Sequence, residues 1–125
     1  MSDNVENQRI ILEMGTGNDL YGMDYTKAAK RAIHDALHHS SLVMFKSLGL
    51  SHEEMQVNVT IGVQEPERLD INALIAELPR GKATVKGVIG GLNVEDPEND
   101  QTHVIATAAV EAFLPITPEK WKLSD

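Results

Sequence analysis

The residues best suited to binding a ligand stand together in one glycine-rich segment, Gly15-Thr16-Gly17-Asn18-Asp19-Leu20-Tyr21-Gly22. Glycines let a ligand approach the backbone closely, and the N–H groups at the start of a helix attract anions. We therefore predict a turn in which Gly15, Gly17 and Gly22 bind a ligand. A nucleotide is the less favoured ligand, because the dinucleotide-binding motif needs a glycine where Leu20 stands.

Ionisable side chains near this segment are candidates for catalysis. We predict that Asp19 is a polar anchor, that Tyr21 is a hydrogen-bonding wall and that Glu13 is an acid–base group. Lys86 is predicted to contact an anion or a carboxylate. The alternative is a purely structural tight turn, in which Asp19 bonds nearby backbone N–H groups. The sequence identifies no reaction, ligand or cofactor, and it leaves open whether the protein is an enzyme.

The glycine-rich segment, followed by residues 24–29, resembles the signature of a family of conserved hypothetical proteins from bacteria and plants. That signature is Gly-x-Gly-x-Asp-x-His-Gly, and Tyr21 stands here in place of its histidine. The resemblance implies no assigned activity. A base or metal-ligand role of the histidine would not transfer to Tyr21, because a phenol ionises only near about pH 10. The similarity continues through residues 41–42, 61–63, 90–92 and 108–111.

Two histidines, His34 and His38, stand one helical turn apart. This is the spacing of the zinc ligands in His-Glu-x-x-His enzymes, although the shorter Asp35 stands where those enzymes have glutamate. Solvated helix histidines are the preferred interpretation, and a metal site is the alternative.

Composition narrows the classes of partner. The 125 residues include 11 Lys+Arg against 19 Asp+Glu, for a net charge of -8, and only 4% are aromatic. The electrostatic field of so acidic a protein repels the phosphates of nucleic acid. There is no cysteine, no apolar run of membrane-spanning length and no signal-peptide pattern, so we expect a cytoplasmic protein without disulfides.

Hydrophobic periodicity predicts a two-layer α+β fold, with a mixed four-stranded sheet and helices on one face. The expected order is β-α-β-α-β-β in a single domain over residues 1–125, with a flexible N-terminus (1–8) and a C-terminal tail (115–125). The predicted strands are 9–14, 55–63, 82–89 and 103–114. The predicted helices are 25–40 and 71–78, with a short helix at 42–48 and a brief turn at 51–54.

The last predicted strand is apolar on both faces, since Ile105, Ala109 and Phe113 alternate with another apolar set. One helical layer covers one face only, so we expect another subunit to cover the other. The alternative cover is the tail around Trp121. The preferred function is therefore a small-molecule-binding protein or small enzyme, with its site at the glycine-rich segment and a subunit interface. The second hypothesis is a non-catalytic oligomeric or interaction protein.

Overall fold

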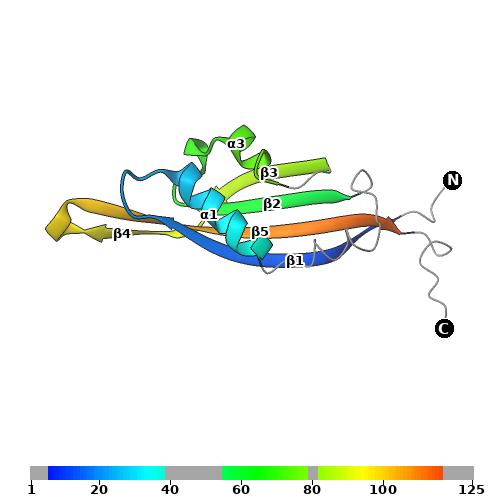
Figure 1. Cartoon of the computed structure of the whole chain (residues 1–125). Coiled ribbons are helices and arrows are strands. Elements are labelled where there is room, and N and C mark those ends of the chain that lie inside the picture. Colours follow the sequence, from blue (N-terminus) through cyan, green and yellow to red (C-terminus); the bar gives the residue numbers. More distant parts are fainter. Residues whose placement is uncertain (1–5, 39–54, 79–81, 117–125) are drawn as a thin grey trace.

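Five strands form one mixed sheet in the computed structural model, which describes residues 6–38, 55–78 and 82–116 (Figure 1). Helices lie along one side of this sheet. The elements are β1 (Glu6–Asp19), α1 (Tyr25–His38), β2 (Gln56–Val63), η2 (Pro66–Arg68), α3 (Ile71–Ile75), β3 (Lys82–Ile89), β4 (Leu92–Asp96), η3 (Pro97–Asn99) and β5 (Gln101–Ile116).

The long strand β5 is the centre of the sheet. The strand order is β1-β5-β2-β3, in which β5 is antiparallel to β1 and β2, and β2 is parallel to β3. Where β2 ends, β4 takes its place beside β5. The last pair of β2 with β5 is Gly62–Thr107, and the next pair along β5 is Leu92–Ile105, which belongs to β4. Gly91 makes this step between strands possible, since it has a φ of +62 and a Cβ there would overlap the Ile105 carbonyl.

The core lies between the sheet and the helical layer. Alanines of α1 pack directly on the sheet, and the alternate residues of β2 and β5 that face them are almost fully buried. Small side chains let a helix lie close to a sheet, and the valines then fill the space beneath. The buried core comprises Ile11, Tyr25, Ala28, Ala29, Ala32, Ile33, Ala36, Met55, Val57, Val59, Ile61, Val63, Leu69, Leu74, Val104, Ala106, Ala108, Val110 and Ala112.

Gly15 and Gly17 do not end the first strand, so the prediction of a turn beginning at Gly15 is wrong. Both glycines continue β1, which stays paired with β5 as far as Asp19. A Cβ on Gly15 would overlap backbone atoms of Ala32 and Ala36, and a Cβ on Gly17 would overlap those of Ala28 and Ala32. The absence of a side chain at these two glycines therefore allows the backbone of α1 to lie against the sheet.

The α+β class and the mixed sheet are confirmed, but the predicted number of strands is wrong. The additional strand, β4, lies between the Gly90-Gly91 turn and the acidic loop. The second predicted helix is shorter than expected, since α3 ends at Ile75. The predicted segments 42–48 and 51–54 and the tail around Trp121 lie outside the described residues. Within the described residues, no helix is long and apolar enough to span a bilayer.

Candidate functional site

One face of the sheet has no described helix over it. Successive side chains of a strand point to opposite faces, so strand register assigns each side chain to the helical face or to this uncovered face. The uncovered face carries Leu12, Met14, Thr16 and Asn18 of β1; Gln56, Asn58 and Thr60 of β2; Lys82, Thr84, Lys86 and Val88 of β3; Leu92, Val94 and Asp96 of β4; and Gln101, His103, Ile105, Thr107, Ala109, Glu111 and Phe113 of β5.

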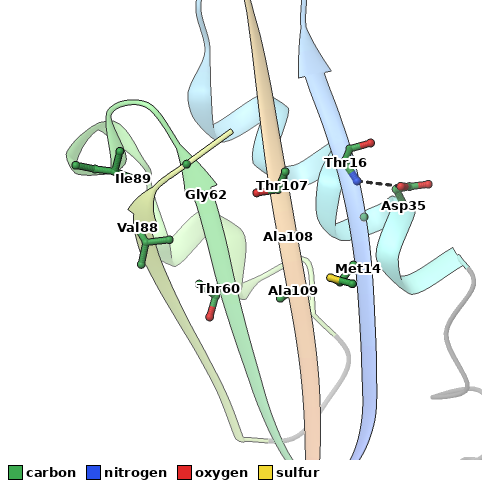
Figure 2. Close-up of a pocket in the computed structure, with 12 residues that line it drawn as sticks. Met14, Thr16, Asp35, Thr60, Gly62, Val88, Ile89, Thr107, Ala108 and Ala109 are labelled. Atoms are coloured by element: carbon green, nitrogen blue, oxygen red, sulfur yellow. Dashed lines mark hydrogen bonds between the residues drawn. The ribbon is translucent and has the colours of Figure 1, made fainter. Parts of the chain in front are cut away.

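A hollow of about 500 Å³ lies in the middle of the uncovered face (Figure 2). Its floor lies below the surrounding side chains because the central strands carry small residues there, among them Gly62 and Ala109. Met14 and Val88 stand on either side of this floor. The lining residues are Met14, Gly15, Thr16, Asp35, Thr60, Gly62, Val88, Ile89, Gly90, Thr107, Ala108 and Ala109. Small central residues between larger flanking ones therefore create the hollow.

Three hydroxyl groups and one carboxylate supply polar side chains to the hollow. The hydroxyls belong to Thr16, Thr60 and Thr107, which come from three adjacent strands. The carboxylate belongs to Asp35 of α1, and its Oδ2 accepts the backbone N–H of Thr16 at 2.9 Å (Figure 2). Asp35 thus supplies a hydrogen-bond acceptor to the backbone of β1, a strand at the edge of the sheet. Among the residues that the structure describes, it is the only charged one that lines the hollow.

Asp19 lies outside the hollow. It is only 2% exposed, and its Oδ2 accepts the backbone N–H of Asp24 at 2.9 Å. Its Oδ1 lies 3.7 Å from Arg31 Nη1 and 4.0 Å from Lys27 Nζ. The carboxylate therefore holds the loop between β1 and α1, as the structural alternative proposed. Asp24 in turn caps α1, because its Oδ1 accepts the backbone N–H of Lys27.

The other predicted site residues are spread over the molecule. Tyr21 is 71% exposed and Gly22 has a φ of +87, so the true turn occupies only the end of the glycine-rich segment. Neither residue lines the hollow. Glu13 pairs in register with Val110 on the helical face, whereas Lys86 lies on the uncovered face beside the hollow. The structure does not bring Glu13 and Lys86 together.

The predicted histidine pair lies on α1. His34 Nε2 is 2.8 Å from Glu77 Oε1, so this ring contacts the segment that follows α3. Across residues 6–38, 55–78 and 82–116, no three His, Cys, Asp or Glu side chains gather in a way that could hold a metal ion.

Sequence reasoning missed a polar cluster around the buried Tyr25. The Tyr25 hydroxyl donates to Glu65 Oε2 at 2.8 Å and accepts from Asn93 Nδ2 at 2.8 Å, and the Arg68 guanidinium lies 4.9 Å from the ring centroid. These contacts join α1, η2 and β4. No motif spacing could have revealed the cluster, because its members come from distant segments.

Burial raises the pKa of the Tyr25 hydroxyl, and the neighbouring Glu65 carboxylate adds to the increase, while the hydrogen bond from Asn93 opposes it. Above about pH 10 the unfolded chain ionises this phenol while the folded protein keeps its proton. We therefore expect the free energy of unfolding to fall as the pH rises from about 9 to about 11. Urea unfolding should show a smaller fall for Tyr25→Phe than for the wild type.

Tyr21→Phe is the matched control for this prediction, because it leaves Tyr25 as the only tyrosine of the chain's two. This variant should retain the alkaline loss of stability. Its tyrosinate absorbance should also develop above the ordinary pKa of about 10. Development of the absorbance below that pKa would contradict the expected shift.

Polar contacts also fix the end of the sheet beyond the hollow. His103 Nδ1 lies 2.9 Å from the Leu20 carbonyl, and its Nε2 lies 3.6 Å from Asp96 Oδ2. A hydrogen bond from the Asn99 side chain, together with His103, lowers the pKa of the Asp96 carboxyl. These contacts connect β4 and β5 to the loop that precedes α1.

Comparisons with known proteins place the chain among uncharacterised relatives. The model of a conserved hypothetical protein family, Lin0512_fam, matches residues 9–112. Among solved structures, the chain is similar to an FtsZ-like protein of unknown function from Nostoc punctiforme, with 33% sequence identity and a TM-score of 0.76. That match covers 90% of this chain and 99% of the other. A comparison with curated proteins found no match.

Proposed function

The chain belongs to the conserved hypothetical protein family Lin0512_fam, and we propose that it binds an uncharged small molecule in the hollow on the uncovered face. The observation that carries this proposal is that three threonines from adjacent strands line a hollow with apolar sides. Its volume of about 500 Å³ is within the range of small-molecule sites. Such sites typically combine apolar walls with a few polar groups that orient the ligand.

The lining also favours a particular ligand chemistry. No lysine, arginine or histidine within residues 6–38, 55–78 and 82–116 lines the hollow, and the Asp35 carboxylate at its rim would repel an anion. The net charge of -8 acts in the same direction. The proposed ligand therefore carries hydroxyl or amide groups for Thr16, Thr60 and Thr107, and an apolar part for Met14 and Val88.

The proposed site overlaps only the first part of the glycine-rich segment. Gly15 and Thr16 border the hollow, whereas the three predicted catalytic residues, Asp19, Tyr21 and Glu13, do not. Among the described residues that line the hollow, Asp35 carries the one basic group, and its Oδ2 already accepts the backbone N–H of Thr16 at 2.9 Å. Binding is therefore the function proposed, without a catalytic step.

A second candidate function is a non-catalytic interaction protein in which the glycines are purely structural. The packing of Gly15 and Gly17 beneath α1 favours it, because that contact gives both glycines a role without any ligand. Under this alternative, a partner covers the uncovered face and no small molecule occupies the hollow.

Hexane-1,2-diol tests whether the hollow binds a ligand at all. Hexanoate tests the preference for an uncharged ligand, because it has the same carbon chain and carries a negative charge. In an NMR titration of ¹⁵N-labelled protein, we expect the diol to cause saturable shifts of the Thr16, Thr60 and Thr107 amides. We expect hexanoate to cause much smaller ones. The proposal fails if the diol leaves these amides unchanged, or if hexanoate binds as tightly.

Thr107→Val tests the role of a single hydroxyl, since valine keeps the shape of threonine but cannot hydrogen-bond. We expect the dissociation constant of the diol to rise by about fivefold or more, in line with one lost hydrogen bond of about 1 kcal/mol. The control is Thr102→Val, which makes the same change on the helical face of β5. Equal effects of the two variants would argue against binding in the hollow.

A further inference from the structure

We propose that the uncovered face of the sheet packs against a second copy of this chain, with the two sheets face to face. This inference does not depend on a ligand in the hollow, because it rests on the whole face. A second copy would nevertheless close the hollow from above.

The first observation is the amount of apolar surface on this face. Met14 is 73% exposed and Leu92 is 55% exposed, and further large apolar side chains on the same face are also open to solvent. Polar side chains such as Thr60, Lys86 and Thr107 stand among the apolar ones. The apolar side chains of this face are Leu12, Met14, Val88, Leu92, Val94, Ile105, Ala109 and Phe113. Several large apolar side chains left exposed on one face are typical of an interface.

The second observation is the size of the face. Strands lie about 4.8 Å apart and rise about 3.3 Å per residue, so the paired strands present roughly 800 Å². A stable protein interface buries about 800 Å² on each partner. The face is thus large enough to hold two copies together, and twisted sheets commonly pack face to face.

The third observation concerns charge, and it favours a second copy over a different partner. The chain has a net charge of -8, so two copies repel one another unless their contact surfaces lack free carboxylates. The described strands contribute two acidic side chains to the uncovered face, and each has a partner. Arg9 Nη1 lies 3.1 Å from Glu111 Oε2, and Asp96 Oδ2 accepts the Asn99 side-chain amide at 2.8 Å. This face is therefore one on which two acidic copies can meet.

The two edges of the face carry opposite charges at nearly the same height along the strands. Asp35 lies at the β1 edge beside Thr16, and Lys86 lies on β3 in register with Thr60. Thr60 pairs across the sheet with Ala109, which in turn pairs with Met14, two residues from Thr16. A two-fold axis parallel to the strands would lay the β1 edge of one copy over the β3 edge of the other. Asp35 of each copy would then approach Lys86 of the other.

The first test is the mass of the ligand-free protein in solution, measured by sedimentation equilibrium. We expect the wild type to have the mass of an assembly and Leu92→Asp to have the mass of one chain, because the substitution would bury a charge in the contact. Leu92 is half exposed in the single chain, so the variant should fold, which circular dichroism can check. Met14→Glu is a second such variant.

Tyr21→Glu is the matched control for Met14→Glu, since Tyr21 is about as exposed as Met14, at 71% against 73%, but lies in the loop, away from the uncovered face. It should keep the mass of the wild type. A wild-type protein that sediments as one chain would overturn the proposal, and so would folded Leu92→Asp and Met14→Glu variants that keep the wild-type mass.

Charge reversal tests the arrangement of the two copies. Lys86→Asp and Asp35→Lys should each weaken association by about tenfold, and an equimolar mixture of the two variants should associate more tightly than either alone. Mixed variants that associate no better than the separate ones would overturn the two-fold arrangement. None of these measurements uses the diol, so failure of the assembly and failure of the hollow as a binding site are distinguishable.

Discussion

Replacing Gly15 or Gly17 with alanine should destabilise the protein more than any other single methyl addition in β1. A Cβ at Gly15 would overlap the Ala32 carbonyl oxygen and the Ala36 nitrogen, which are backbone atoms of α1. Backbone cannot rotate away as a side chain can, so α1 would have to move off the sheet. Overpacking typically costs about 1–3 kcal/mol, and we expect about 3 kcal/mol or more here. Urea unfolding measures the loss.

Gly22→Ala provides the control for this prediction, because it adds the same methyl group where no atom lies within 4 Å. Gly22 has a φ of +87, so the control carries a backbone cost of about 1–2 kcal/mol without any overlap. Alanine at position 15 or 17 should therefore cost clearly more than alanine at position 22. An equal or smaller cost would mean that α1 does not lie as close to β1 as the structure shows.

The elements with a regular hydrophobic pattern were predictable from the sequence. The alternation over residues 55–63 identified β2, and the alanine stripe identified α1 from its first residue, Tyr25. The predicted end of this helix, at residue 40, lies outside the described residues. These patterns arise because each element buries one face, which leaves a direct record in the sequence. The uncovered side of β5 was also foreseen, since Ile105 and Phe113 are apolar but lie outside the helical layer.

The glycine-rich segment shows why the rest was not predictable. Glycine serves both turns and close backbone contacts, and only the position of α1 over β1 separates the two uses. Similarly, β4 contains Glu95 and Asp96, which are typical of loops, and it becomes a strand because β5 offers a free edge beyond the end of β2. The hollow depends on the register of four strands, so no local pattern could reveal it.

Asp19→Ala should destabilise the protein by about 2–3 kcal/mol, the second large effect we expect. The carboxylate is almost fully buried and accepts the Asp24 N–H at 2.9 Å, so its removal leaves that donor without a partner. The Arg31 and Lys27 side chains lie farther away, at 3.7 and 4.0 Å, and are about half exposed. Solvent screens such pairs, and most of the cost should come from the lost hydrogen bond.

Asp19→Asn separates the hydrogen bond from the charge, because asparagine keeps a side-chain oxygen for the Asp24 N–H but carries no charge. We expect it to cost about 1 kcal/mol or less, and an equal cost for the two variants would mean that charge dominates. Both variants should bind hexane-1,2-diol as the wild type does, since Asp19 is outside the hollow. A loss of diol binding in folded Asp19→Asn would instead restore Asp19 to the binding site, as the glycine-rich segment first suggested.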